Sequence, residues 1–418
     1  MDHFQYRDNR LYAEDVPVEK IAAEVGTPVY IYSHATLTRH FLTFDRAFNQ
    51  VDHLTCFSVK SNSNLALLSL FSTLGGGMDI VSGGELYRAL KSGVPPRRIV
   101  YSGVGKTMAG MTLALQTGIL MFNIESPQEL EMLSQRAQAL NVVAPIALRV
   151  NPDVDPKTHP YISTGLKMNK FGIDIEKSRQ EYIRAAKMPG IKVIGVDFHI
   201  GSQLTSLEPF MEALVRIRYL ISLLRGEGLS IQYLDIGGGL GITYNLEEPP
   251  HPDDYANAII VGTEDLGVTL IMEPGRVIVG NAGILVTRVL YIKRGEAKNF
   301  IIVDAGMNDL IRPSIYNSFH TIRAVAQPES GTMVADVVGP ICESGDFFAK
   351  DREIPIVSQG QLLSIMSAGA YGFSMSSNYN SRPRAAEVMT HGAEYRVIRE
   401  RESYDDLTRL ETVPNWVE

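Results

Sequence analysis

The sequence predicts a (β/α)8 barrel of the TIM type, in which parallel strands alternate with helices, followed by a separate antiparallel β domain. Up to Gly280 the 418-residue chain alternates short apolar runs with segments of helical period, which is typical of such a barrel. After Gly280 the pattern changes to short β-branched runs such as Phe300-Ile301-Ile302-Val303, which favour β structure. An open doubly wound sheet is the competing arrangement for the first part, because periodicity alone does not exclude it.

Eight strands are predicted before Gly280, each a short apolar run that stops at a polar residue. The first of them, Leu54–Lys60, alternates in a way that indicates a strand with both faces covered. The predicted strands end at Lys60, Ser82, Ser102, Asn123, Asn151, His199, Asp235 and Glu273.

The segments between these strands carry start and stop signals of helices. Ser126-Pro127-Gln128-Glu129 combines a capping box with proline at the first helical position. Leu86–Leu90 runs into the C-cap signal Lys91-Ser92-Gly93, and Pro209–Leu224 bears an apolar stripe of helical period. Helices are therefore expected between most of the strands.

The part after Gly280 is expected to form a β domain of short strands. They are predicted at Ile284–Lys293, Asn299–Val303, Thr321–Val325, Thr332–Val338, Ile354–Val357 and Leu362–Met366. The N-terminal stretch Leu11–Tyr32 is expected to join this domain or to bridge the two units. The predicted domains are an N-terminal segment of residues 1–28 associated with the β domain, the barrel of residues 29–280, and the β domain of residues 281–418.

Composition limits the kind of protein. The chain is 45% hydrophobic and 21% charged, which is ordinary for a soluble globular protein, and its net charge of −8 argues against nucleic acid as a partner. Two cysteines give no disulfide framework and favour a reducing compartment, so a cytoplasmic location is expected. No signal peptide follows Met1, and no apolar run approaches the roughly 20 residues that a membrane helix needs. Neither a membrane partner nor a metal site is predicted.

Lys60 is the first candidate for chemistry. It ends a strand ahead of the small polar turn Ser61–Asn64, which places its amine at the rim of the barrel, and a partly desolvated amine forms Schiff bases. On position alone, a solvated lysine at a strand end is the simpler interpretation. His199 ends the sixth strand on the same rim; a lone histidine is more often structural, but a flat imidazole there could stack on a planar cofactor.

The turns after the last two strands suit charged groups of a ligand. Gly237, Gly238 and Gly239 let backbone N–H groups turn toward a phosphate without obstruction by a Cβ atom. A dinucleotide fingerprint would need a third glycine that is missing, and a plain tight turn is the other alternative. Glu273 and Arg276 could form a surface ion pair, or could meet a heteroaromatic nitrogen and a substrate carboxylate respectively.

Together these groups describe a site for one cofactor. An amine, a phosphate cradle, a carboxylate for a ring nitrogen and a flat stacking partner are the requirements of pyridoxal 5′-phosphate. This cofactor acts as an electron sink once an amine is bound to it as a Schiff base. The barrel is therefore predicted to be the cofactor-binding domain.

Over nearly its whole length the chain resembles the fold-type III pyridoxal-phosphate-dependent decarboxylases, which have an alanine racemase-like fold. Phe57-Ser58-Val59-Lys60-Ser61-Asn62 matches their cofactor-lysine motif, with serines in place of two alanines. His199-Ile200-Gly201-Ser202-Gln203 matches the segment of the stacking histidine, and Glu273-Pro274-Gly275-Arg276 matches the segment that meets ring nitrogen, phosphate and substrate. The cofactor-binding residues that the resemblance implies are Lys60, His199, Ser202, Gly238, Gly239, Glu273, Gly275, Arg276 and Tyr371.

Three segments after Gly280 extend the resemblance: Arg312–Tyr316, Gly339–Asp346 and Ala368–Gly372. Gly339–Asp346 resembles the segment that reaches into a neighbouring subunit's site, which implies Cys342 as a proton donor and Glu343 as the partner of a distal substrate amine. Without the resemblance, Cys342 is simply a small buried thiol and Arg312 a surface arginine. The implied catalytic residues are Lys60, His199 and Cys342, and the implied substrate-binding residues are Arg276, Arg312, Tyr316, Glu343 and Tyr371.

Within this family the chain specifically resembles members that convert meso-2,6-diaminopimelate to L-lysine and CO2, and this resemblance implies a homodimer with two shared active sites. Two arginines and Glu343 would meet the extra charges of a substrate with two carboxylates and two amines. The alternatives are a decarboxylase of ornithine, arginine or a D-amino acid, a racemase of the same broad fold, and a non-catalytic carrier of the cofactor. The polar loop Pro156–Gly172 is predicted to be a functional lid.

Overall fold

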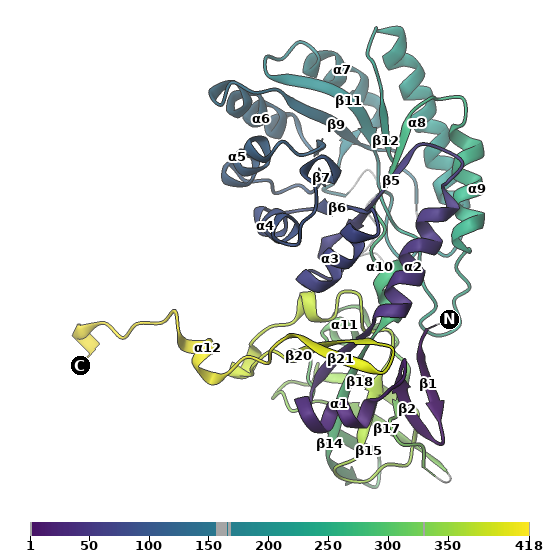
Figure 1. The fold of residues 1–418 in the computed structure, drawn as a ribbon, viewed down its shortest axis with the longest axis vertical. Coiled ribbons are helices and arrows are strands. Elements are labelled where there is room, and N and C mark those ends of the chain that lie inside the picture. The colour runs from purple at the N-terminus through teal and green to yellow at the C-terminus, as the bar shows by residue number, and fades with distance from the viewer. Residues whose placement is uncertain (1, 156–164, 166–168, 329–330, 418) are drawn as a thin grey trace. The chain divides into compact units, whose positions relative to one another are not determined.

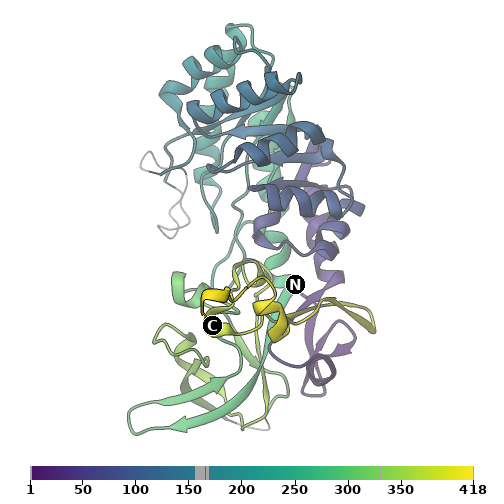
Figure 2. The same ribbon diagram turned by 90° about the vertical axis from the view of Figure 1, so that its left-hand side faces the viewer.

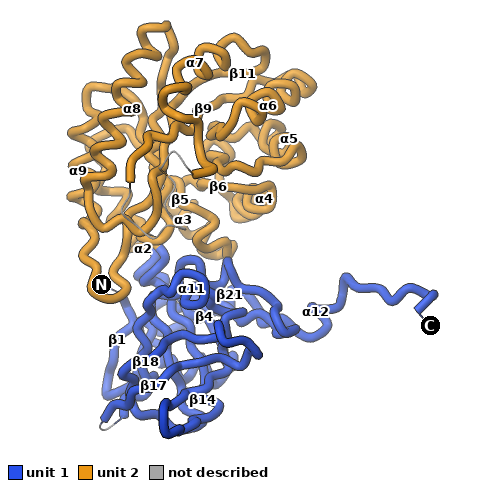
Figure 3. The backbone as a smooth tube through the Cα atoms, turned by 180° about the vertical axis from the view of Figure 1, so that it is seen from behind, with its two compact units in different colours: residues 1–37, 279–418 blue, residues 38–278 orange. Residues whose placement is uncertain are grey.

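The protein consists of two compact units. A computed structural model describes residues 2–155, 165, 169–328 and 331–417. Thr38–Ile278 form one unit, and Met1–Leu37 together with Val279–Glu418 form the other (Figure 3). None of the helices in these described ranges is long and apolar enough to cross a membrane.

The first unit is a closed barrel of eight parallel strands. The strands are β5 (His53–Ser58), β6 (Gly77–Ile80), β7 (Ile99–Tyr101), β8 (Met121–Ile124), β9 (Ala144–Asn151), β11 (Ile191–Asp197), β12 (Tyr233–Asp235) and β13 (Thr269–Met272). Each pairs in parallel with its neighbours, and the β13–β5 and β8–β9 pairings complete the ring. The barrel prediction is confirmed, and the open-sheet alternative is wrong because an open sheet would leave two unpaired edges. A short strand, β10 (Ile173–Asp174), adds to β9.

Helices lie outside the strands of the barrel (Figures 1 and 2). They are α2 (His34–Ala47), which precedes β5, and then α3 (Leu65–Thr73), α4 (Gly83–Lys91), α5 (Met108–Thr117), α6 (Pro127–Ala139), α7 (Ile175–Ala185), α8 (Glu208–Gly226), α9 (Pro252–Thr263) and α10 (Arg276–Val279). At α6 the predicted capping box forms only in part. Ser126 Oγ accepts a hydrogen bond from Glu129 N, 3.2 Å away, but the Glu129 carboxylate pairs with the buried ammonium of Lys106 at 2.7 Å.

The interior of the barrel is filled by apolar side chains from alternating positions of its strands. One cluster of buried residues draws Cys56, Val100, Met121, Ala147, Ile194 and Ile271 from β5, β7, β8, β9, β11 and β13. Because six of the eight strands contribute buried side chains to this cluster, the barrel is a packed core rather than a channel.

The second unit is built around a mostly antiparallel sheet. Its strands run in the order β18 (Phe347–Pro355), β17 (Thr332–Val338), β15 (Asn299–Val303), β14 (Gly283–Arg294), β4 (Val29–Ser33), β20 (Ala386–His391) and β21 (Glu394–Arg399). In addition, β19 (Leu362–Ile365) pairs with β14, and β16 (Ile322–Ala324) pairs with β19. The β15–β17 and β4–β20 pairs are parallel. A small sheet of β1 (Phe4–Arg7), β2 (Arg10–Ala13) and β3 (Val16–Pro17), and the helices α1 (Val18–Val25), α11 (Arg312–Tyr316) and α12 (Tyr404–Thr408), complete the unit.

The strands of the second unit differ from the expected ones in three respects, the first of which is that β20 and β21 were not predicted. The predicted barrel range 29–280 includes β4, whereas this strand pairs with β14 and β20 of the second sheet. All five residues of β4 are buried, so its sequence is the continuous apolar run that a barrel strand also shows. Strand β18 begins at Phe347, well before the predicted start at Ile354, because the charged stretch Lys350–Glu353 masks its alternation.

Removal of side-chain volume from the barrel core tests its packing. Ile271→Ala is expected to lower the free energy of unfolding by about 2–5 kcal/mol, because Ile271 is fully buried and its loss leaves a cavity. The matched control Val261→Ala, on the exposed face of α9, is expected to change it by less than about 0.5 kcal/mol. Urea unfolding followed by circular dichroism measures the free energy of unfolding of both variants. Equal midpoints would contradict the packing of Ile271 in the barrel core.

Candidate active site

Lys60 lies directly beyond the end of a barrel strand. Strand β5 ends at Ser58, and Val59–Ser61 form a single turn of 3-10 helix, so the lysine follows the strand rather than ending it as predicted. Ser61 Oγ donates to the Ser58 carbonyl oxygen at 2.7 Å, which closes the turn. The side chain of Lys60 is 39% exposed, so its amine is accessible from solvent.

Asp79, on the neighbouring strand β6, holds the Lys60 amine. Its Oδ2 atom lies 2.9 Å from Lys60 Nζ and accepts a second hydrogen bond, of 2.5 Å, from Ser58 Oγ. The Asp79 side chain is completely buried. Asp79 was not predicted from the sequence. A charged residue between the apolar Met78 and Ile80 was nevertheless a sign that this strand carries a buried functional group.

Glu273, which follows β13, presents a carboxyl group with altered acidity. Its Oε1 atom accepts hydrogen bonds from Ser102 Oγ at 2.8 Å and from Asn123 Nδ2 at 3.4 Å. Burial and the nearby Asp79 raise the pKa of Glu273 from 4.5 to about 7, against the opposing effect of Lys60. Such a carboxyl binds a proton near neutral pH and can share it with a basic nitrogen.

Further polar groups surround Glu273 at the strand ends. Asn123 Nδ2 donates to Asp235 Oδ2 at 2.9 Å, and burial together with Glu273 raises the pKa of Asp235 well above its ordinary value. Burial and Glu273 also raise the pKa of Asp197, while the buried guanidinium of Arg149 opposes this rise. From the sequence, Asn123 and Asp235 were predicted only as the ends of strands. Asp197 and Arg149 were not predicted as site residues.

His199 presents a neutral imidazole. Its Nδ1 atom accepts a hydrogen bond from Gly238 N at 3.2 Å, so this nitrogen carries no proton. Burial, and then the charges of Arg149 and Lys60, hold the pKa of His199 well below its ordinary value. A neutral, fixed ring of this kind is suited to packing against another flat ring rather than to carrying charge.

The glycine loop after β12 leaves space that any side chain would fill. Gly237 and Gly239 have φ values of 64° and 122°, which favour glycine. A Cβ atom on Gly238 would lie 2.2 Å from the carbonyl oxygen of Glu273. The loop therefore needs glycine at these positions. Two of its backbone N–H groups are held within the site, since Gly237 N donates to Asp235 Oδ1 at 3.0 Å and Gly238 N to His199 Nδ1 at 3.2 Å.

Arg276 begins the short helix α10 with its guanidinium buried. It donates to Tyr244 Oη at 2.7 Å and to Ser202 Oγ at 3.1 Å. The second of these bonds joins two predicted site residues, Ser202 and Arg276. The first adds Tyr244, which was not predicted from the sequence. A Cβ atom on Gly275 would lie 3.1 Å from Ser58 Cβ and Ser61 Cβ, so this glycine allows the close approach of two segments.

Backbone hydrogen bonds join these segments into one site. Ser58 N donates to the Pro274 carbonyl oxygen at 2.9 Å, and Glu273 N donates to the Gly237 carbonyl oxygen at 2.8 Å. The structure thus brings together all eight predicted residues of the barrel: Lys60, His199, Ser202, Gly238, Gly239, Glu273, Gly275 and Arg276. An accessible amine, a neutral imidazole, a glycine loop and a carboxyl that titrates near neutral pH fit the needs of pyridoxal phosphate.

The remaining predicted residues lie in the second unit. Arg312 is buried in α11 and donates to Ser318 Oγ at 3.3 Å, so it is not the plain surface arginine of the simpler interpretation. Cys342 is exposed rather than a buried thiol, and Glu343 beside it is also exposed. Tyr379 Oη donates a hydrogen bond to Glu343, and this bond raises the pKa of Tyr379.

The loop that carries Cys342 is held rigidly within its unit. The Asp346 carboxylate accepts hydrogen bonds of 2.6 Å from Met307 N and from Ile341 N. Ser314 Oγ, on α11, donates to the Gly345 carbonyl oxygen at 2.5 Å. Segments 307–316 and 339–346 are therefore tied together, with Arg312, Tyr316, Cys342 and Glu343 on them.

Tyr371 occupies a strained turn in the same unit. Its φ value of 55° is unusual for a tyrosine, and such strain is frequent at functional sites. The adjacent Gly372 lies against Tyr30, whose Oη donates to the Asp309 carbonyl oxygen at 2.7 Å. Most of the predicted lid Pro156–Gly172 lies outside the described residues.

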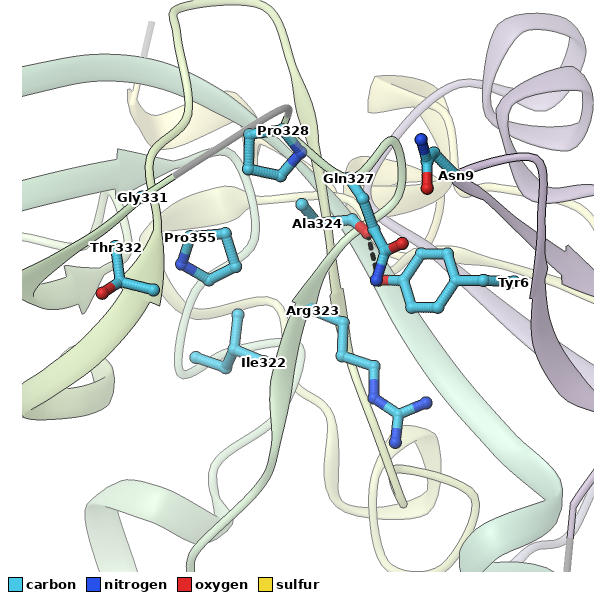
Figure 4. A pocket seen from close by; sticks show the side chains of 10 residues that line it. All are labelled: Tyr6, Asn9, Ile322, Arg323, Ala324, Gln327, Pro328, Gly331, Thr332 and Pro355. Atoms are coloured by element: carbon cyan, nitrogen blue, oxygen red, sulfur yellow. Dashed lines mark hydrogen bonds between the residues drawn. The ribbon is translucent and has the colours of Figure 1, made fainter.

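A separate cavity of about 490 Å³ lies in the second unit (Figure 4). Its lining residues are Tyr6, Asn9, Ile322, Arg323, Ala324, Gln327, Pro328, Gly331, Thr332 and Pro355. Tyr6 Oη donates to the Ala324 carbonyl oxygen within it at 2.5 Å. It contains no predicted site residue. Among the parts of the chain that the structure describes, no group of three or more His, Cys, Asp or Glu residues is arranged to hold a metal ion.

Comparison with known proteins agrees with the predicted fold and cofactor. The family model described as "Pyridoxal-dependent decarboxylase, pyridoxal binding domain" matches residues 34–280. The diaminopimelate decarboxylase of Pseudomonas aeruginosa is 52% identical over 407 residues, which are 97% of this chain and 98% of that protein.

Solved structures give the same result. The diaminopimelate decarboxylase of Helicobacter pylori complexed with L-lysine superimposes with a TM-score of 0.91 at 44% identity, covering 94% of this chain and 98% of that one. The enzyme of M. jannaschii in co-complex with L-lysine gives a TM-score of 0.95 at 37% identity, covering 100% and 99%.

The barrel, its rim residues and the matching family model define the class as pyridoxal-phosphate-dependent decarboxylases of fold type III, and pyridoxal 5′-phosphate is the cofactor. More narrowly, relatives of about half-identical sequence over nearly the full length specify the branch. The chain belongs to the diaminopimelate decarboxylase family.

The acidity of Glu273 predicts a pH dependence of stability. Between its ordinary pKa of 4.5 and the folded-state value of about 7, the folded apoprotein holds a proton that the unfolded chain has lost. This contribution to the free energy of unfolding therefore falls as pH rises through that interval and is constant above it. Glu273→Gln should remove it, as measured by urea unfolding of both apoproteins across the interval.

Glu85 supplies a control for this measurement. Its pKa is also raised to about 7, mainly by burial, so Glu85→Gln should remove a second contribution and leave that of Glu273 in place. If the wild type and Glu273→Gln lost stability in parallel as pH rises, Glu273 would have an ordinary pKa.

The tight packing of the glycine loop predicts that a single added methyl group lowers both cofactor retention and stability. Gly238→Ala should reduce the pyridoxal phosphate retained by purified protein and cost about 1–3 kcal/mol of unfolding free energy, because the new Cβ atom meets backbone that must move. Gly226→Ala, where no atom lies within 4 Å of the new Cβ, should retain full cofactor. Cofactor absorbance per chain distinguishes the two, and equal occupancy would contradict the role of this loop.

Proposed function

We propose that this protein catalyses the pyridoxal-phosphate-dependent decarboxylation of meso-2,6-diaminopimelate to L-lysine and CO2. The observation that carries this proposal is the set of charged side chains Arg276, Arg312 and Glu343. Their charges are complementary to those of a substrate with two carboxylates and two amines. Similarity to diaminopimelate decarboxylases, two of them solved with L-lysine, supports the same choice.

In this proposal Lys60 Nζ is the amine that carries the cofactor at rest. Pyridoxal phosphate, when bound, supplies an electron sink for the electron pair left behind as CO2 departs. Asp79 Oδ2, 2.9 Å from Nζ, orients the lysine and stabilises its ammonium once the substrate amine has replaced it. Because Asp79 is fully buried, it acts through Lys60 and is a positioning residue.

The other barrel residues are proposed to bind and orient the cofactor. Glu273 holds a proton for the ring nitrogen, which its raised pKa makes possible near neutral pH. The Gly238 N–H fixes the neutral imidazole of His199, which packs on the flat ring. Gly238 and Gly239 have no Cβ atom and so leave room for the phosphate beside the loop. Ser202 and Gly275 support the same end of the cofactor, with Arg276 turned toward phosphate and substrate.

Residues of the second unit provide selectivity. Arg312 is proposed to bind the distal substrate carboxylate as a guanidinium fork, and Glu343 the distal ammonium, with Tyr316 and Tyr371 beside them. A site built around such charges rejects ornithine or arginine, because binding either would leave a buried charged group without its partner.

We further propose a cytoplasmic homodimer in which one chain's Cys342 and Glu343 serve the barrel site of the other. Both residues are exposed on a loop that Asp346 holds rigid, which suits a segment presented to a partner. Cys342 Sγ then donates the proton that takes the place of the departing carboxylate. Both cysteines are free thiols, as expected of a protein in a reducing compartment.

A substrate panel tests the reaction. The holoenzyme should release CO2 from meso-diaminopimelate with a kcat/KM at least about a hundredfold above that for ornithine, arginine, lysine or D-amino acids, because each lacks a partner for a buried charge. Arg312→Met should lower the value for meso-diaminopimelate and leave the low rates on the other substrates nearly unchanged.

Each alternative function gives a different result in the same panel. Preference for ornithine or arginine would replace the proposed substrate, and racemisation without CO2 would indicate a racemase. Bound cofactor without turnover of any substrate would indicate a carrier.

Mixing of inactive variants tests the shared site. Lys60→Ala and Cys342→Ala homodimers should each be inactive, and after random exchange of subunits about a quarter of wild-type activity should return, since half the dimers hold one intact site of two. Lys60→Ala mixed with the Lys60→Ala/Cys342→Ala double variant is the matched control and should stay inactive. Failure to recover activity from the first mixture would show that Cys342 does not act across the interface.

A further inference from the structure

The C-terminal tail, defined here as Tyr404–Val417, carries apolar side chains that its own unit does not bury. Trp416 is 84% exposed and Leu410 83% exposed. Tyr404, Val413 and Val417 are also exposed. In Figure 1 the chain beyond α12 runs away from the sheet of its unit and ends far from it. A set of exposed apolar side chains on one segment indicates a surface that another molecule covers.

The tail has regular local structure. Ser403 caps α12 with a complete capping box, and Arg409 N donates to the Asp405 carbonyl oxygen at 2.9 Å. Further along, Glu411 N donates to the Thr408 carbonyl oxygen at 2.8 Å, and a last 3-10 turn spans Asn415–Val417. Each of these bonds joins residues of the tail region itself. The tail is therefore organised by its own sequence and presents its apolar side chains outward.

The root of the tail is fixed to the face that carries Glu343. Glu402 Oε2 accepts hydrogen bonds from Asn378 Nδ2 at 2.6 Å and from Arg384 N at 3.0 Å. Asn378 precedes Tyr379, whose hydroxyl donates to Glu343. The tail therefore leaves its unit beside the segment that the proposed function assigns to the partner's site.

The length and charge of the tail favour a protein partner. From Glu402 to Val417 it spans at most about 50 Å, enough to cross onto a neighbouring chain. Asp405, Asp406 and Glu411 outweigh Arg409 in its charge, which opposes binding to anionic lipid or nucleic acid. Tryptophan, tyrosine and leucine on a mildly acidic segment suit an apolar protein surface.

We propose that the C-terminal tail packs on a second copy of this chain, with Leu410 and Trp416 as its anchors. The inference rests on the proposed homodimer and goes beyond it, since the shared site requires only the Cys342–Glu343 loop. The tail then adds apolar contact area to the dimer without contributing to the chemistry.

Trp416 makes this proposal directly measurable, because it is the only tryptophan in the chain. In the dimeric holoenzyme its fluorescence should be blue-shifted and several-fold less sensitive to acrylamide than that of N-acetyltryptophanamide. Dilution below the dimer dissociation constant, followed in parallel by analytical ultracentrifugation, should shift the emission to the red and restore quenching. Protection that does not change with dilution to monomers would place Trp416 against its own chain and overturn the proposal.

Two substitutions separate the tail from general surface effects. Leu410→Asp keeps the Trp416 reporter and should weaken dimerisation about tenfold or more, as expected for loss of an anchor residue. Its activity should fall at low enzyme concentration and return at high concentration. Tyr219→Asp, on the exposed face of α8, is the matched control and should dimerise like the wild type.

The results distinguish this inference from the proposed function. A dimer that recovers activity on subunit mixing but leaves Trp416 fully accessible would overturn the tail contact alone. The same holds if Leu410→Asp dimerises as tightly as the wild type. A wild-type holoenzyme that is monomeric and active at every concentration would overturn both the homodimer and the tail contact.

Discussion

Four carboxyl groups buried at the carboxyl ends of the barrel strands are the constraint on which the site depends. Asp79, Asp197, Asp235 and Glu273 are all buried, and their mutual repulsion adds to the cost of burial in raising the pKa of the last three. Closure of the barrel brings these strand ends to one rim, so the carboxyls cannot separate. Their charge is offset by cations and protons, which is the condition for binding a basic ring nitrogen.

Lys60 takes part in this balance of charges. Its amine pairs with Asp79 at 2.9 Å and lowers the pKa of Glu273, while it remains accessible to a ligand. The acidity of Glu273 is therefore linked to the state of Lys60, because the two groups share a poorly solvated environment.

The second unit solves a different physical problem, which is to present charged residues on a rigid loop. Asp346 accepts two backbone hydrogen bonds of 2.6 Å and so fixes the turn that carries Cys342 and Glu343. Arg312 is buried on the helix that the same loop contacts through Ser314. Ordering of these groups before a ligand arrives lowers the entropic cost of binding it.

The sequence by itself determined the eight alternating strands of the barrel, because hydrophobic period is a local property of the chain. Its local motifs, some of them only through the family resemblance, also named the eight barrel residues that the structure brings together. It did not predict Asp79, Asp197, Arg149 or Tyr244, since each matters only through a neighbour far away in sequence. Only the tertiary structure shows that β4 belongs to the second sheet, that Cys342 is exposed and that Arg312 is buried. Burial depends on what packs against a segment, which the local sequence does not reveal. The raised pKa of Glu273 belongs to the same class, since it arises from carboxyls that different strands bring together.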